Sequence, residues 1–108
     1  MDRLLAMRTL LALLLFAALG QAAKSPLVVF VCGDHEYSGE STLPLLAKTL
    51  ESQYKFRTQV LESSPDQNGE TDIPGLEALA QADLVVFYLR WRRLPPAQLA
   101  HIEGYLKS

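Results

Sequence analysis

The chain has few of the residues and motifs that mark the commoner kinds of functional site. Its 108 residues contain one cysteine, Cys32, so no internal disulfide can form and stability must come from packing. No HExxH motif places two histidines on one helix face, and Gly69 stands at the wrong offset for an EF-hand loop between Asp66 and Asp72. We therefore predict no metal site and interpret residues 62–75 as a solvated surface loop.

Basic residues are also scarce. Arg90, Arg92 and Arg93 form the one local basic cluster, which is too small to follow a phosphate backbone. Residues 24–108 carry eleven acidic against eight basic side chains. The sequence therefore predicts no nucleic-acid partner, and no pattern in it indicates a particular cofactor.

The first 23 residues have the layout of a secretory signal peptide. Arg3 and Arg8 precede an apolar run over residues 10–19, and small residues at 20, 22 and 23 offer a peptidase site. The rival interpretation is a membrane anchor, but residues 9–23 are shorter than the roughly 20 residues that span a bilayer. No cysteine follows the small residues, so no lipid attachment is implied. We expect cleavage, no stable membrane anchor afterwards, and a periplasmic or extracellular location.

The remaining residues alternate between strand and helix patterns. Residues 27–32 and 84–89 are continuous β-branched and aromatic runs, the pattern of parallel strands buried on both faces. Residues 41–54 have helical spacing, with Ser41 as a plausible N-cap and Pro44 in the first turn. Residues 56–61 alternate as in a half-exposed strand nearer a sheet edge.

Two further helical segments complete the pattern. Residues 76–82 predict a short helix, and Pro95 and Pro96 open another in which Leu99, Ile102 and Leu106 share a face. A crossover helix returns a chain to its sheet, and no returning strand follows. We expect an α/β fold with a three-layer parallel sheet, truncated after about three strands.

The expected topology brings two loops together. In doubly wound sheets, ligands bind at the carboxyl ends of the strands, where the strand order reverses. If the spatial order is second, first, third strand, the reversal lies between the strands ending at Cys32 and Leu89. The loops over residues 33–39 and 90–94 then face one crevice.

These loops carry the candidate site residues. One offers carboxylates and an imidazole, and the other offers guanidinium groups and an indole, a combination able to hold and protonate a polyhydroxy or anionic ligand. The candidates for proton transfer are His35 and Glu36. The candidates for ligand binding are Gly33, Asp34, Tyr37, Arg90 and Arg92.

Each candidate also has a structural interpretation. Gly33 can relieve the strand-end turn, Asp34 can accept backbone N–H bonds there, and Glu36 can favour the dipole of the following helix. Arg90 needs a partner at the end of a buried strand, either a ligand or an ion pair with Asp34 or Glu36. Cys32 lies at the end of an apolar run without a nucleophile elbow, so we interpret it as a core residue.

Several stretches of this sequence resemble the ThuA-like (trehalose utilisation) family. They are Phe30-Val31-Cys32-Gly33-Asp34-His35-Glu36-Tyr37, Leu43-Pro44-Leu45-Leu46-Ala47, Ile73-Pro74-Gly75-Leu76-Glu77-Ala78-Leu79 and residues 82–95, which lead into Gln98, His101, Ile102 and Tyr105. The similarity covers essentially all of residues 24–108. In full-length relatives a further strand and loop complete the crevice, so the resemblance implies that these residues are the N-terminal half of such a domain.

The resemblance implies a flavodoxin-like, class I glutamine amidotransferase-like fold and a link to sugar metabolism. Most members lack the amidotransferase cysteine, so the fold alone does not imply glutamine hydrolysis. Our leading hypothesis is an exported domain that processes or binds a carbohydrate or sugar derivative between the first and third strands. In it His35 or Glu36 moves protons and Arg90 orients the ligand. The alternatives are a non-catalytic binding or interaction module and an inactive fragment.

Overall fold

The computed structural model describes residues 2–20, 24–34, 36–65 and 67–108. They form three strands, three α-helices and two short 3-10 helices. In chain order these are α1 (Asp2–Gly20), β1 (Leu27–Gly33), α2 (Gly39–Tyr54), β2 (Arg57–Glu62), η1 (Gln67–Glu70), η2 (Leu76–Gln81), β3 (Leu84–Leu89) and α3 (Pro96–Leu106).

The three strands form one parallel sheet in the order β2-β1-β3. Val28 of β1 lies opposite Thr58 in β2 and Leu84 in β3. The expected order of second, first, third strand is therefore confirmed, and the reversal of strand order lies between β1 and β3.

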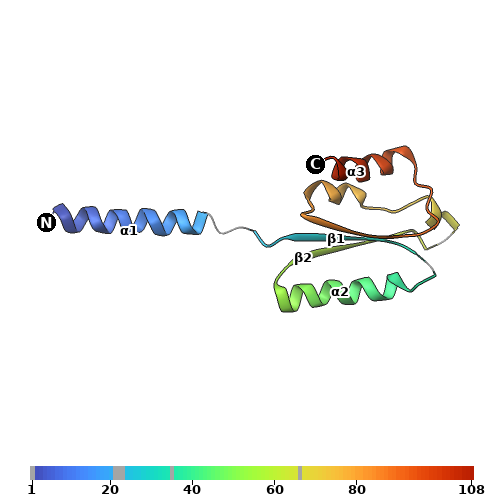
Figure 1. Cartoon of the computed structure of the whole chain (residues 1–108), viewed down its shortest axis with the longest axis horizontal. Helices are drawn as coiled ribbons and strands as arrows, with labels where there is room; N and C mark the ends of the chain where they lie inside the picture. The colour runs from blue at the N-terminus through green and yellow to red at the C-terminus, as the bar shows by residue number, and fades with distance from the viewer. Residues whose placement is uncertain (1, 21–23, 35, 66) are drawn as a thin grey trace.

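Helices cover both faces of the sheet (Figure 1). Helix α2 lies on one face, while η2 and α3 lie on the other. Phe30 of β1 is fully buried on the α2 side, and Val29 and Val31 are fully buried on the η2 and α3 side. The continuous apolar run of β1 thus has the double burial that its sequence predicts, because β1 has a strand on each side and a helical layer on each face.

Strand β3 was expected to be buried on both faces, and this expectation is wrong. Leu84 is 52% exposed, and Tyr88 and Leu89 are also exposed. The reason is position, since β3 pairs with β1 alone and helix α2 packs mainly on β1 and β2. Its apolar side chains therefore reach the surface at one edge of the sheet.

Helix α2 begins earlier than its sequence predicts. Its first residue is Gly39, and Ser38 precedes it in the left-handed conformation (φ 60°) without a capping side-chain bond, so Ser41 is not the N-cap. A Cβ on Gly39 would collide with the ring of Tyr88 in β3. The helix can therefore start this close to the sheet only at glycine, and Pro44 falls inside the helix instead of in its first turn.

Helix α3 packs on η2 and on the sheet edge. Ile102 and Tyr105 contact the buried cluster, whereas Leu99 and Leu106 are exposed, so the expected shared apolar face is only partly used. The Gln98 side-chain amide donates to Asp72 at 2.8 Å, and its oxygen accepts the Ile73 N–H at 3.0 Å. These two bonds hold the segment before η2 against α3.

Helix α1 lies apart from the α/β body (Figure 1). Within the described residues, no helix combines the length and the apolar character needed to cross a bilayer.

Candidate functional site

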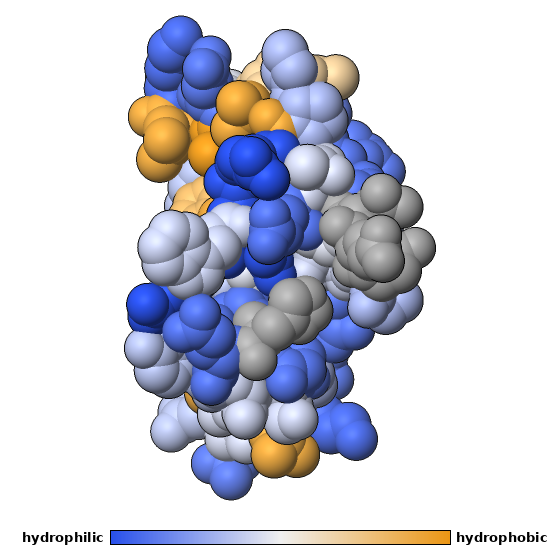
Figure 2. Space-filling model, turned by 90° about the vertical axis from the view of Figure 1, so that its right-hand side faces the viewer, coloured by the Kyte–Doolittle hydropathy of each residue, from blue (hydrophilic) through white to orange (hydrophobic). Residues whose placement is uncertain are grey.

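The loops after β1 and β3 meet at the carboxyl ends of these strands. The Arg90 backbone N–H donates to the Gly33 carbonyl at 3.1 Å, which continues the β1–β3 pairing into the two loops. Figure 2 looks onto this end of the molecule, where the surface is mostly hydrophilic and hydrophobic atoms gather toward the α3 side. The two loops that the sequence analysis expected to face one crevice are thus neighbours.

Four side chains from the two loops form a connected group, which we call the Arg90 cluster: Glu36, Tyr37, Arg90 and Trp91. Arg90 Nε lies 3.4 Å from one Glu36 carboxylate oxygen, and Arg90 Nη1 donates to the Tyr37 hydroxyl at 2.6 Å. The Trp91 indole N–H donates to the other Glu36 oxygen at 3.1 Å. Of the two ion-pair partners considered for Arg90, the structure therefore has Glu36.

The Arg90 guanidinium also lies against two aromatic rings. Its central carbon is 5.2 Å from the Tyr37 ring centroid and 5.5 Å from that of Trp91. Both distances are within the range of cation–π attraction. Tyr37 is 58% exposed and Trp91 is 68% exposed, so the two rings remain available at the surface.

Backbone strain occurs on both loops. Ser38 and Trp91 have positive φ values of 60° and 57°, and Lys55 is the third described non-glycine residue of this kind. Such a conformation is uncommon for a bulky residue and costs about 1–3 kcal/mol. At Trp91 it turns the chain immediately after Arg90, which allows Trp91 to bond with Glu36 on the facing loop.

Asp34 is a buried residue at 3% exposure, and its carboxylate organises the first loop. It accepts the backbone N–H groups of Glu36 at 3.0 Å and Tyr37 at 2.8 Å. Burial by itself would raise the pKa of Asp34, but backbone N–H groups of Glu36, Tyr37 and Gly39 and the Arg90 charge outweigh it and lower that pKa. Asp34 is therefore an ionised carboxylate that shapes the loop, as its structural interpretation predicts.

Gly33 lies close to two side chains of β3 and the loop after it. A Cβ on Gly33 would lie 2.7 Å from a Leu89 methyl carbon and 2.9 Å from Arg92 Nε. Both contacts are shorter than carbon and nitrogen atoms tolerate, so a larger residue would displace the Leu89 and Arg92 side chains. Gly33 thus acts on the site through the placement of these two side chains.

A hollow of about 250 Å³ lies beside the Arg90 cluster, lined by Asp34, Tyr37, Tyr88, Leu89 and Arg90. Asp34, Tyr37 and Arg90 are candidate residues from the sequence, and the β3 residues Tyr88 and Leu89 supply an apolar wall. An arrangement of one apolar wall, one aromatic ring and a few fixed polar groups is typical of small-molecule sites.

Cys32 is a free, buried cysteine, as expected. Burial raises the pKa of the Cys32 thiol, and the hydrogen bond from the Asp34 backbone N–H only partly offsets that rise. A protonated thiol is a poor nucleophile, which fits a core role.

The remaining candidates have different outcomes. His35 lies outside the described residues. No group of His, Cys, Asp and Glu side chains among the described residues is suited to hold a metal ion.

Asp72, expected in a solvated loop, is half-buried, and hydrogen bonds from the Ser64 hydroxyl and the Gln98 amide lower its pKa. It ties the loop after β2 to α3.

Two neighbours of the site were not among the predicted site residues. Trp91 joins the Arg90 cluster, and Ser63, the residue after β2, contacts Arg92. An aromatic residue two positions after the end of a predicted strand was a usable signal for Trp91. No local pattern distinguishes Ser63 from the other serine in its loop.

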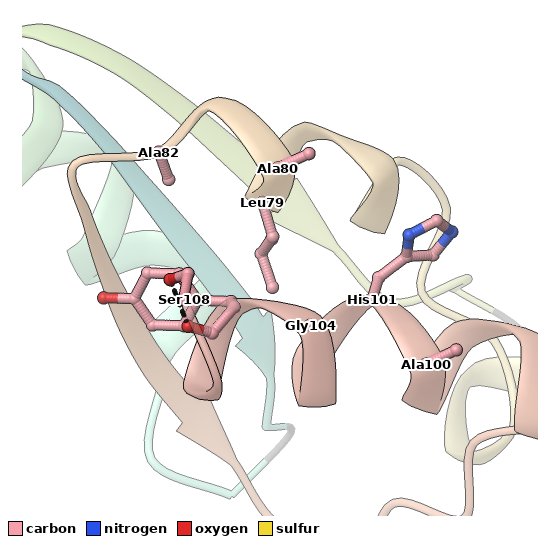
Figure 3. A pocket seen from close by; sticks show the side chains of 8 residues that line it. Leu79, Ala80, Ala82, Ala100, His101, Gly104 and Ser108 are labelled. Atoms are coloured by element: carbon pink, nitrogen blue, oxygen red, sulfur yellow. Dashed lines mark hydrogen bonds between the residues drawn. The ribbon is translucent and has the colours of Figure 1, made fainter.

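A second hollow, of about 320 Å³, lies away from these loops between η2 and α3 (Figure 3). Leu79 points from η2 toward α3, and His101 and Ser108 are also in its lining. His101 is exposed, as expected, and several of the other lining residues are small. This hollow has no charged lining residue and no polar side chain directed into an enclosed space, so the loops remain the better candidate site.

Comparison with known proteins identifies no relative: no family model, no curated protein and no solved structure matches this chain.

Proposed function

We propose that this chain is an exported ThuA-like domain with a flavodoxin-like sheet that binds a carbohydrate or sugar derivative between the loops after β1 and β3. The observation that supports the proposal is the Arg90 cluster. It combines two exposed aromatic rings with a guanidinium and a carboxylate that are held in fixed positions.

The chemistry of this cluster suits a polyol. The faces of Tyr37 and Trp91 can cover the apolar C–H surface of a sugar ring, because aromatic side chains combine an apolar body with a polar edge. Arg90 and the hydroxyl of Tyr37 can then serve the sugar hydroxyls as hydrogen-bond donors and acceptors. The adjoining hollow has room for part of a small ligand.

Binding is better supported than proton transfer. Both oxygens of Glu36 are already engaged, one by Trp91 and one by Arg90, and Asp34 is engaged by backbone N–H groups. A processing role would assign proton transfer to His35 or would require Glu36 to leave its partners. Replacing His35 by alanine separates the roles, because loss of turnover with retained affinity would establish processing.

The test is a titration of the full chain with neutral sugars, glucose and trehalose, by ligand-observed saturation-transfer NMR. We expect saturable binding that is lost in Tyr37→Ala and Trp91→Ala. Tyr54→Ala is the matched control, because Tyr54 is an equally exposed tyrosine on α2, with 62% exposure. Binding that survives both loop variants, or that Tyr54→Ala abolishes equally, would exclude this site.

Export is the second part of the proposal. Cleavage after the small residues at positions 20, 22 and 23 would leave a protein that begins near Lys24. Mass spectrometry of the protein from the periplasm or medium should detect this start, and recovery of an intact residue 1–108 chain from the cytoplasm alone would contradict it.

A further inference from the structure

The loop after β3 carries three arginines that differ in their partners. Arg90 pairs with Glu36 at 3.4 Å, and Arg93 pairs with Glu70 at 3.3 Å. Within the described part of the chain, no carboxylate oxygen lies within 4 Å of the Arg92 guanidinium. Among the residues that the structure describes, Arg92 is therefore the arginine of this loop whose charge has no direct counter-ion.

Arg92 is also held more deeply than its neighbours. It is half-buried, and its stem crosses the open face of Gly33, where its Nε would lie 2.9 Å from a Cβ. This Nε is buried and donates to no acceptor among the described residues. A buried donor without a partner is rare in folded proteins and calls for a specific explanation, such as a bound ion.

The two outer nitrogens of Arg92 are only loosely engaged. Nη1 lies 3.4 Å from the Trp91 carbonyl, and Nη2 lies 3.4 Å from the Ser63 hydroxyl. Both distances exceed the usual 2.7–3.2 Å of an N–H···O bond. Both nitrogens and the Ser63 hydroxyl can therefore turn to a better acceptor without breaking a strong bond.

The place of this group in the sheet favours a ligand. Gly33 ends β1, while Ser63 and Arg92 follow β2 and β3, so all three lie at the carboxyl ends of the strands, beside the Arg90 cluster. The nearby carboxylates of Asp34 and Glu36 are already engaged by N–H groups and by Arg90. Glu40 and Glu62 line a hollow next to Cys32 that also reaches Asp34 and Ser63, so an anion at Ser63 is expected on the side of this serine that faces Arg92.

We propose that Arg92, with Ser63, binds the anionic group of the ligand, so that the ligand is a sugar acid or a sugar phosphate. The inference rests on the proposed sugar site and narrows its ligand class. A carboxylate or phosphate accepts two parallel bonds from the planar guanidinium, the geometry in which arginine binds most strongly. An anion also supplies the counter-charge that a half-buried cation otherwise lacks.

The experiment uses Trp91, the only tryptophan of the chain, as a fluorescent reporter beside Arg92. The full chain is titrated with glucose, glucuronate, glucose 6-phosphate and inorganic phosphate. We expect at least one charged sugar to bind about tenfold or more tightly than glucose. In Arg92→Gln this preference should disappear, so that charged and neutral sugars bind about equally.

Arg93→Gln is the matched control, because Arg93 is in the same loop, its side chain is 81% exposed and it is paired with Glu70. It should keep the preference for the charged sugar. Far-UV circular dichroism checks that each variant is folded. If Arg92→Gln is unfolded, Ser63→Ala decides, because it should weaken charged sugars and leave glucose unchanged.

The outcomes separate this inference from the proposed function. Equal affinity for charged and neutral sugars, or a preference that survives both Arg92→Gln and Ser63→Ala, overturns the anion site and leaves the sugar site standing. Arg92-dependent binding of inorganic phosphate without binding of any sugar supports the anion site and contradicts the proposed function. Glucuronate and glucose 6-phosphate, the two charged sugars, distinguish a carboxylate from a phosphate as the anionic group of the ligand.

Discussion

The two edge strands of the sheet differ in how they meet solvent. Strand β2 alternates, with Arg57, Gln59 and Glu62 exposed and Leu61 buried. Strand β3 has no charged residue, yet Leu84, Tyr88 and Leu89 are exposed. Charged and polar side chains are the usual protection of an open edge against pairing with other chains. β2 has this protection and β3 does not.

One contact from another element covers part of the β3 edge. Amides alternate in direction along a strand, and Arg90 donates to Gly33 of β1, so the amides of Val85, Phe87 and Leu89 point to the open side. The Val85 N–H donates to the Tyr105 hydroxyl of α3 at 3.1 Å. A sheet edge can thus be protected by its own alternating sequence or, in part, by a side chain from a distant helix.

The largest expected effect concerns how much one buried side chain on each edge strand contributes to the stability of the fold. Leu61 of β2 is 5% exposed and packs in the cluster with Val29 and Ile73. Leu61→Ala should destabilise the fold by about 2–5 kcal/mol because it leaves a cavity. Val85→Ala in β3 removes fewer methyl groups and should cost about 2 kcal/mol. Urea unfolding measures both, with Gln59→Ala as an exposed control, and a larger loss for Val85→Ala would contradict this order.

Removing the side-chain cover from β3 should have a smaller effect. Tyr105→Phe keeps the ring contact with Phe87 but removes the acceptor of the Val85 N–H, at a cost of about 1 kcal/mol. Amide exchange at Val85 should accelerate. Tyr54→Phe, on the exposed side of α2, should change neither quantity. Unchanged exchange at Val85 in Tyr105→Phe would mean that the hydroxyl does not protect this edge.

Adding a charge to the apolar edge should change association more than stability. Leu84→Lys gives β3 the kind of residue that protects β2, so concentration-dependent association should fall while stability changes by less than about 0.5 kcal/mol. Sedimentation and urea unfolding measure the two effects. Gln59→Lys adds the same charge to the edge that is already polar. An equal fall in association there would assign the effect to net charge instead of the β3 edge.

The smallest effect is on the pH dependence of stability between neutral and acid solution, and it compares the loops after β1 and β2. Asp34 and Asp72 both have lowered pKa values in the folded chain. Each therefore contributes stability that is present above the unfolded pKa, about 4, and is lost as pH falls through the lower folded pKa. Asp34→Asn and Asp72→Asn should each flatten the acid limb of a stability–pH curve. If the acid part of the stability–pH curve keeps its slope in both variants, these two carboxylates do not contribute to acid-sensitive stability.

The strand order and the meeting of two loops could be predicted, because crossover rules and apolar runs leave few topologies. The ion-pair and hydrogen-bond partners of the site residues could not be predicted. Glu36 and Asp34 were both possible partners of Arg90, and the choice depends on Asp34 turning toward backbone N–H groups. The bond between Trp91 and Glu36 depends on a positive φ that no local sequence pattern predicts for tryptophan.

The elements of this protein follow from its local sequence: three apolar or alternating strands, the helices between them and the residues at the strands' carboxyl ends. Local apolar periodicity decides these features, because it sets which backbone conformation can bury side chains. The tertiary structure was needed to learn that β3 lies exposed at an edge, that Gly39 starts α2 and that Arg92 has no counter-ion among the described residues. Each of these depends on contacts between residues far apart in the chain, which periodicity does not specify.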